Sequence, residues 1–273
     1  MFFNREQISQ FKTVVFEFLL VEHTGHRLII TLNRPEKKNA MNDTLVHELA
    51  FALAYAKFTQ SVWLVIVKAN GTIFCAGADL NNFLQPQESA ISTVPNPLQV
   101  VKLGDAFAQV FKPIIGQVHA SVFAGGFLIL GGCTHVIAVE QAQFSLPEVK
   151  RGIWPFQVMA SLQAIVPARQ LIDWCMRGHV LNAQEAHKMG IVTDVVTEQE
   201  LENKTNQLAV EIENSAPLAI NKGLEAYHTF LMLNGEDKHS YLHRMLQELL
   251  QSDDAKEGIL AFKEKRKPVW KNK

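Results

Sequence analysis

Two runs of small residues stand where the backbone itself could do chemistry. The first is "FCAGADL" at 74–80, after the apolar run 62–69, and the second is "FAGGFLI" at 123–129. Small residues let a ligand approach the backbone closely, and amides at the start of a helix have no partner within it. Two such amides facing one point form an oxyanion hole, where one donor contributes about 3 kcal/mol of transition-state stabilisation. Tight packing alone would favour the same small residues.

Strands and helices alternate around these two runs. The segments with strand character are 13–20, 27–34, 62–69, 112–118 and 135–139. Gly25 can turn the chain between the first two, which predicts an antiparallel pair. Asn42 is a suitable N-cap for the helical pattern of 43–58, and an apolar helix is expected within 123–133. Helices between strands indicate parallel pairing, so the body is predicted to be α/β.

The C-terminal part of the chain has a different pattern. After about residue 198 the apolar spacing becomes helical, and the chain ends in the basic stretch "FKEKRKPVWKNK". We therefore expect a body at 1–197 and a smaller helical region at 198–273 that packs on a neighbouring subunit. Segment 84–97 contains three prolines and few apolar residues, which is typical of a mobile loop.

Composition excludes several classes of function. The chain has 273 residues, 48% of them hydrophobic, and a formal net charge of −1, so nothing indicates nucleic acid or an anionic membrane as a partner. No segment approaches the roughly 20 apolar residues of a membrane span. The three cysteines, Cys75, Cys133 and Cys175, form neither a disulfide framework nor a metal motif, so we expect free thiols and a cytoplasmic protein. No metal site and no separate cofactor are predicted.

Five motifs together are similar to those of one known family. They are "LNRPEKKNAMN", "FCAGADL", "KPIIGQVHASVFAGGF", "AQFSLPEVKRGIWP" and "AFKEKRK", and the resemblance that they carry covers roughly residues 14 to 267. In this order and spacing the chain resembles the enoyl-CoA hydratase/isomerase (crotonase) family. The resemblance implies a crotonase-like spiral of ββα units, a C-terminal helical trimerisation region, and a homotrimer or hexamer. Its substrates would be acyl-CoA thioesters, with coenzyme A as part of the substrate.

The resemblance also assigns roles to individual residues. It places the thioester oxygen between the backbone amides of Ala76 and Gly125, and it makes Glu148 of "SLPEV" a catalytic acid/base. Residues expected to bind the substrate are Lys37, Lys38, Ala40, Gly77, Ala78, Asp79, Leu80, Leu128, Trp154, Phe262 and Lys265. Within this set Lys37 or Lys38, with Phe262 and Lys265, would contact the nucleotide or phosphates of coenzyme A. Asp79 is expected to cap a helix that starts at Leu80 and to have no acid/base role.

The chain departs from the family pattern at two places. The position of a second glutamate in the hydratases is Leu128, which cannot move a proton. After "RGIWP" the chain has Phe156, Gln157, Val158 and Met159 in place of a glycine-rich turn, which indicates a reshaped acyl pocket.

One carboxylate can still shift a double bond from the 3,4 to the 2,3 position, and it can hydrate a 2-enoyl thioester through one water. A non-catalytic acyl-CoA binder remains an alternative. So does a relative with decarboxylase or thioesterase activity on a CoA or carrier-protein substrate.

Three other residues are weaker candidates for a catalytic role. His119 and His135 flank the glycine run and could reach the pocket, although histidines at strand ends more often make structural hydrogen bonds. Cys75 lies inside the first run, and a lone cysteine beside small residues usually serves packing.

Overall fold

A six-stranded sheet forms the centre of the molecule. The computed structural model describes residues 2–80, 91–231, 233 and 235–273. The strand order is β1-β2-β3-β4-β6-β9, and every pair is parallel except the antiparallel β1 and β2. The strands are β1 (Leu19–Thr24), β2 (Arg27–Leu32), β3 (Leu64–Ala69), β4 (Ile114–Val118), β6 (His135–Val139) and β9 (Asp194–Val196). This sheet confirms the predicted parallel pairing.

A second, smaller sheet is built from three short strands. They are β5 (Val122–Phe123), β7 (Gln143–Ser145) and β8 (Val180–Asn182), in the order β5-β7-β8. Strand β5 directly follows β4 in the chain, whereas β7 and β8 belong to the segment between β6 and β9. The two sheets therefore meet where the chain passes from β4 to the second run of small residues.

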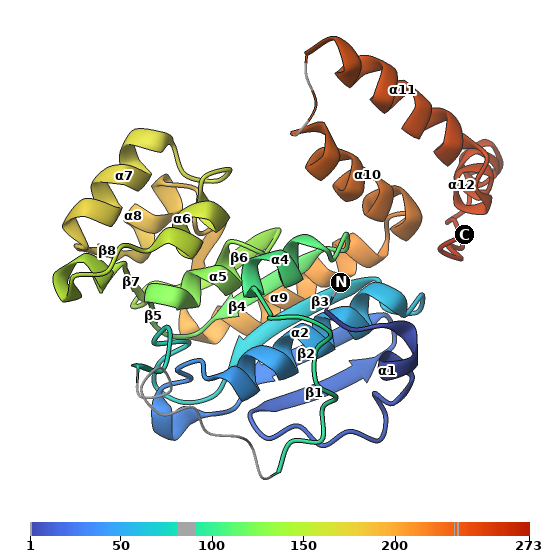
Figure 1. Ribbon diagram of the computed structural model, residues 1–273. Coiled ribbons are helices and arrows are strands. Elements are labelled where there is room, and N and C mark those ends of the chain that lie inside the picture. Colours follow the sequence, from blue (N-terminus) through green and yellow to red (C-terminus); the bar gives the residue numbers. More distant parts are fainter. Residues whose placement is uncertain (1, 81–90, 232, 234) are drawn as a thin grey trace.

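Helices cover the large sheet and surround the small one (Figure 1). The helices of the body are α1 (Arg5–Ser9), α2 (Asp43–Phe58), α4 (Leu103–Ala108), α5 (Phe127–Leu130), α6 (Phe156–Leu162), α7 (Ala168–Arg177), α8 (Ala183–Lys188) and α9 (Glu198–Glu213). Three 3-10 turns are η1 (Pro35–Lys37), η2 (Ala124–Gly126) and η3 (Pro147–Arg151). Helix α2 starts as predicted, because the Asn42 side chain accepts the Leu45 amide at 3.0 Å.

Strand β1 begins later than the sequence predicts. The expected strand 13–20 is irregular up to Phe18, and the hairpin turns at Gly25, which has φ +60°. The amides of Glu17 and Phe18 donate to the carboxylate of Glu48 on α2, at 2.6 and 2.9 Å. A fully buried carboxylate thus takes the backbone donors that a strand partner would have used.

The structure agrees only partly with the predicted helix within 123–133 and describes only part of the predicted loop 84–97. The apolar helix expected within 123–133 is a 3-10 turn followed by four α-helical residues, so it is shorter than predicted. Of the loop 84–97, residues 84–90 lie outside the described residues, and 91–97 contain no helix or strand.

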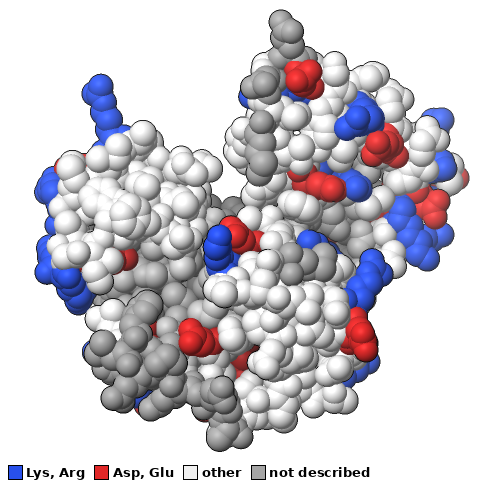
Figure 2. All heavy atoms as spheres, viewed as in Figure 1, with Lys and Arg blue, Asp and Glu red and all other residues white. Residues whose placement is uncertain are grey.

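The C-terminal helices divide into two groups. Helix α9 packs on β3, β4 and β6, with Leu201, Thr205 and Ala209 buried. Helices α10 (Pro217–Phe230), α11 (Gly235–Leu250) and α12 (Asp253–Glu264) instead project away from the sheet (Figure 1). Acidic and basic side chains are interspersed over this projection (Figure 2). The division of the chain at residue 198 stays a prediction.

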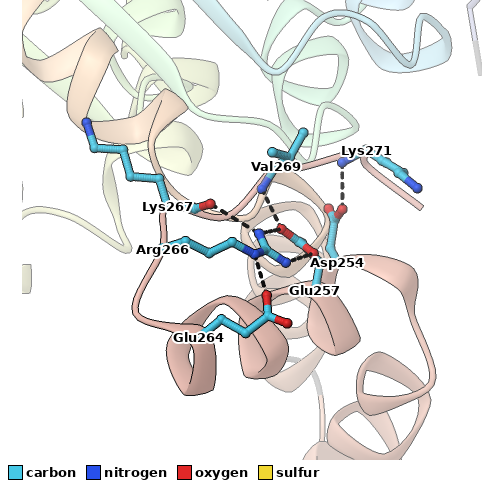
Figure 3. A network of polar contacts seen from close by, with 7 residues as sticks. All are labelled: Asp254, Glu257, Glu264, Arg266, Lys267, Val269 and Lys271. Atoms are coloured by element: carbon cyan, nitrogen blue, oxygen red, sulfur yellow. Dashed lines mark hydrogen bonds and ion pairs between the residues drawn. The ribbon is translucent and has the colours of Figure 1, made fainter.

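The basic C-terminal stretch folds back on α12 and the body. The Arg266 guanidinium binds Glu257 and Glu264, and the Val269 amide donates to Glu257 at 2.8 Å (Figure 3). Further along, the side chain of Asn272 donates to Gln60 O at 2.9 Å, and the Gln60 side chain donates to Asn272 O at 2.8 Å. The tail therefore ties the projecting helices to the end of α2.

Candidate active site

Three hydrogen bonds fix the first run of small residues against the segment 38–41. The Ala76 amide donates to Lys38 O at 3.0 Å, the Met41 amide to Gly77 O at 2.8 Å, and the Asp79 amide to Met41 O at 2.9 Å. Because Met41 bonds to both neighbours of Ala78 in a parallel bridge, the N–H of Ala78 itself faces the other way. Within the described part of the chain that amide has no hydrogen-bond acceptor.

The second run brings another amide to the same place. Ala124 has φ +51°, a left-handed conformation that an alanine adopts at a cost of about 1–2 kcal/mol, and it turns the chain from β5 into η2. The Gly125 amide follows at the start of this turn, and among the described residues it too has no acceptor. A Cβ built on Gly125 would lie 3.4 Å from the Ala78 nitrogen, so the two runs are in contact.

These bonds correct one prediction. The Ala76 amide is already bound to Lys38 O, so it cannot donate to a ligand at the same time. In the part of the chain that the structure describes, the amides of Ala78 and Gly125 have no acceptor and can donate to a ligand. The sequence alone does not show which alanine presents a free amide, because the direction of each N–H depends on Gly77, whose φ of +94° turns the chain between them.

Glu148 is a half-buried carboxylate. It lies in the 3-10 turn that Pro147 begins, and its Oε2 is buried without a hydrogen-bond partner in the described structure. Burial raises the pKa of the Glu148 carboxyl, while a backbone amide and the charge of Arg151 oppose the rise. An unpaired carboxylate oxygen with a raised pKa is suited to accept and return a proton.

The two amides and Glu148 line one cavity of about 910 Å³. Of the residues predicted from the sequence, the cavity is lined by Lys38, Ala76, Ala78, Leu80, Gly125, Leu128, Glu148 and Trp154. Of the four residues in the second departure from the family pattern, Phe156, Gln157 and Val158 line the cavity, whereas Met159 does not. Leu128 therefore takes an apolar place in the wall, and Glu148 is the one carboxylate among the described lining residues.

Six predicted residues do not line this cavity. They are Lys37, Ala40, Gly77, Asp79, Phe262 and Lys265. Gly77 and Asp79 lie behind the wall, where Asp79 forms an ion pair with Arg34. Phe262 is 86% exposed on α12, and Lys265 ends that helix, so the chain does not bring either residue to its own cavity.

Several lining residues were missed by sequence reasoning. Gly178 ends helix α7, and Val180 begins β8, a three-residue strand with no pattern of its own in the sequence. Ser145 lines the cavity from β7 and donates to Gly178 O at 3.3 Å. Lys150 and Arg151 add positive charge close to Glu148. Both residues lie in the same sequence motif as Glu148, which could have indicated that they are close to it.

His119, His135 and Cys75 make hydrogen bonds to nearby residues and do not line the cavity. His119 bonds to Gly71 O at 2.8 Å, His135 contacts Thr134 at 3.1 Å, and neither lines the cavity. All three cysteines are free, as predicted. The Cys75 thiol donates to Asn39 O at 3.2 Å, and burial raises its pKa to about 12, which keeps it protonated and unreactive.

Comparison with known proteins identifies the family. The family model described as enoyl-CoA hydratase/isomerase matches residues 25–273. The chain belongs to the enoyl-CoA hydratase/isomerase family. Its relatives in this family include a carnitinyl-CoA dehydratase of Escherichia coli O157:H7, which is 34% identical over 94% of this chain and 99% of the relative. A "Probable enoyl-CoA hydratase, mitochondrial" of Dictyostelium discoideum is 30% identical over 92% of this chain and 90% of the relative.

Solved structures confirm the fold. An enoyl-CoA hydratase from Mycobacterium tuberculosis H37Rv superposes with a TM-score of 0.83 at 28% identity, covering 94% of this chain and 99% of that one. The predicted α/β crotonase fold with C-terminal helices is therefore correct. In the described ranges no group of three or more His, Cys, Asp or Glu could hold a metal ion. No described helix is long and apolar enough to cross a membrane.

Proposed function

We propose that this protein is an enoyl-CoA hydratase or isomerase in which Ala78 and Gly125 bind the thioester oxygen and Glu148 moves the proton. The observation that supports this most is the meeting of two amides without acceptors and one unpaired carboxylate oxygen on a single cavity. An acyl thioester bound there gains negative charge on its oxygen when a proton leaves its α carbon. The two amides stabilise that charge.

A single carboxylate is sufficient for both reactions. In isomerisation Glu148 removes a proton from carbon 2 of a 3-enoyl thioester and returns it to carbon 4, so the double bond moves into conjugation. In hydration Glu148 takes a proton from water as the oxygen adds to carbon 3, and Glu148 then returns this proton to the α carbon. Leu128 offers no second acid, which favours the isomerase because that reaction needs one group on one face.

Coenzyme A is expected to lie outside the cavity, between Lys37 or Lys38 and the C-terminal helices. Lys38 lines the cavity and is exposed, as a phosphate ligand would be. Because Phe262 and Lys265 project from α12 away from this cavity, we propose that they reach the coenzyme A of a neighbouring copy in a homotrimer or hexamer. Exposed apolar side chains on α10–α12 support such an interface, namely Tyr227, Leu231, Leu242, Leu246, Leu250, Ile259 and Leu260.

The second candidate substrate carries a positive charge. Carnitine contains a quaternary ammonium group, which aromatic rings bind well, and Trp154 and Phe156 both line the cavity. Against this, the described lining carries three cations, Lys38, Lys150 and Arg151, and one carboxylate. Like charges repel, so an uncharged acyl group is the better match. A cytoplasmic location stays a prediction.

The test follows the conjugated enoyl thioester by absorbance. Purified protein is incubated with crotonyl-CoA, with crotonyl-CoA that carries a trimethylammonium group on carbon 4, and with 3-hexenoyl-CoA. Loss of conjugation identifies a hydratase, and gain of conjugation from 3-hexenoyl-CoA identifies an isomerase. Both must depend on Glu148, so the Glu148→Gln variant is expected to lose about 100-fold or more of the activity.

Other outcomes would contradict the proposal. Binding of all three thioesters without turnover would support a non-catalytic binder. Release of free coenzyme A or carbon dioxide from suitable thioesters would support a thioesterase or a decarboxylase. Turnover that is unchanged in Glu148→Gln would remove Glu148 from the mechanism.

A further inference from the structure

Arg34 lies behind the wall of the cavity and holds both sides of the paired segments 38–41 and 76–79. Its Nη1 donates to the carboxylate of Asp79 at 2.7 Å and to Ala40 O at 2.8 Å. The two side chains are 10% and 13% exposed, so water screens this ion pair little. The guanidinium thus connects the residue directly after Ala78 to the strand segment that pairs with it.

Arg34 is itself fixed by its surroundings. Its amide donates to the side chain of Asn39 at 2.9 Å, and the Asn39 amide donates back to Arg34 O at 3.0 Å. Asn39 is fully buried and, with φ +52°, adopts a left-handed conformation. The Phe18 ring covers the guanidinium at 5.0 Å. Asn39 therefore holds the backbone of Arg34, and the guanidinium lies against the Phe18 ring where it bonds to Asp79.

The direction of the Ala78 amide depends on the bonds on either side of it. The Asp79 amide donates to Met41 O, while the Asp79 side chain is held by Arg34. If Asp79 moves, the Ala78–Asp79 peptide shifts against Met41, and the Ala78 N–H no longer points at the position shared with Gly125. Misplacement of a reacting group by about 1 Å can cost 100-fold in rate.

We infer that Arg34 is a positioning residue that aims the Ala78 amide through Asp79 and Ala40. The inference rests on the proposed function, because the direction of this amide matters only if a thioester oxygen binds there. Arg34 does not line the cavity, so its loss should change the polarisation of the bound thioester more than its affinity.

The test uses a chromophoric thioester and a matched pair of variants. A cinnamoyl-CoA absorbs at longer wavelength when hydrogen bonds polarise its carbonyl, so its shift on binding reports the oxyanion hole directly. The variant is Arg34→Lys, which keeps the charge but cannot hold two acceptors in one plane. The control is Arg27→Met, which breaks the ion pair with Glu213 at 2.7 Å, with side chains 20% and 21% exposed, between β2 and α9.

Arg34→Lys should change the red shift and kcat, whereas Arg27→Met should change neither. Arg34→Lys is expected to bind the cinnamoyl-CoA within about 3-fold of the wild-type dissociation constant, to show a smaller red shift, and to lose about 10- to 100-fold in kcat with little change in KM. Arg27→Met is expected to keep the full red shift and kcat, even where its thermal stability falls. If Arg34→Lys does not fold, Asp79→Asn replaces it, because the amide oxygen keeps one hydrogen bond and loses the charge.

Three results would overturn the inference. The first is a folded Arg34→Lys or Asp79→Asn with the wild-type red shift and kcat. The second is a control Arg27→Met that loses shift and kcat in parallel. The third is a wild type that binds cinnamoyl-CoA without any red shift, which would also remove the oxyanion hole from the proposed function. The first two results leave that function standing, so the two failures can be told apart.

Discussion

Gly77 lies so close to Ala124 that a Cβ on Gly77 would stand 2.6 Å from the Cβ of Ala124. The same added atom would be 2.9 Å from the Gly125 nitrogen. Real Cβ atoms do not approach this closely, so the two runs of small residues could not meet with a larger residue at position 77. The contact that brings the Ala78 and Gly125 amides together therefore depends on one missing methyl group.

The Gly77→Ala variant is expected to lose about 100-fold or more of kcat, because the clash moves both amides and φ +94° strains an alanine. Gly25→Ala is the control: its φ of +60° also disfavours alanine, but nothing lies within 4 Å of the added atom and the hairpin turn is remote from the cavity. Steady-state kinetics and thermal denaturation of both variants separate the two effects. Equal loss of kcat in the two variants would contradict this explanation.

Glu148 should make activity and stability depend on pH in opposite directions. Burial raises its pKa in the folded protein, so kcat falls as pH drops through that raised value and the base becomes protonated. The folded state binds the proton more tightly than the unfolded state, so this group lowers stability as pH rises above its ordinary value near 4.5.

Glu148→Gln should therefore unfold at higher urea concentration than wild type at pH 7, and the difference should shrink at pH 4. Urea titrations at the two pH values measure it. A variant that is less stable than wild type at pH 7 would mean that the buried carboxylate has a partner in the folded protein.

Leu128→Glu tests whether the missing second acid limits hydration. The new carboxyl would share the cavity with Glu148 and could protonate the α carbon, so hydration of crotonyl-CoA should rise about 10-fold or more. Leu128→Met is the control for the change in shape alone. Hydration no faster than that of the methionine variant would show that Glu148 and one water already complete the reaction.

The Arg266 network should hold the C-terminal tail in place (Figure 3). In Arg266→Met the amide hydrogens of Val269 and Lys271 should exchange with solvent faster than in wild type. Arg244→Met, which removes an exposed pair with Glu248 at 3.9 Å, should leave both unchanged.

The hydrogen bonds from Arg266 and Val269 lower the pKa of Glu257 to about 2. The ionised Glu257 carboxylate therefore contributes to the stability of the folded protein above pH 4.5, and this contribution is lost as pH falls through about 2. Hydrogen exchange at pH 7 measures the effect of each variant. If the Val269 amide hydrogen exchanged at the same rate in wild type and in Arg266→Met, residues other than Arg266 would hold the C-terminal tail in place.

The sequence predicted those parts of the molecule that depend on neighbouring residues. The hairpin at Gly25, the cap at Asn42 and the buried strand β3 follow from short patterns. The place of Glu148 in the cavity wall follows from the resemblance of its motif to one family. What could not be predicted depends on contacts between distant residues. Glu48 captures amides about 30 residues away and delays the start of β1, and Met41 decides which alanine presents a free amide. Val180 has no local signal because a strand of three residues has no periodicity.

The order of strands in the large sheet has a consequence for how this protein could acquire new reactions. Strands β6 and β9 are neighbours in the sheet, yet residues 140–193 lie between them in the chain, and that insertion carries Glu148, Trp154 and Phe156. The amides of Ala78 and Gly125 precede it. Mutations within the insertion can thus exchange the acid/base group or the acyl pocket while the pairing of the large sheet and both amide donors stay intact. The two amides proposed to bind the thioester oxygen can therefore stay unchanged while the rest of the site evolves on a separate stretch of one gene.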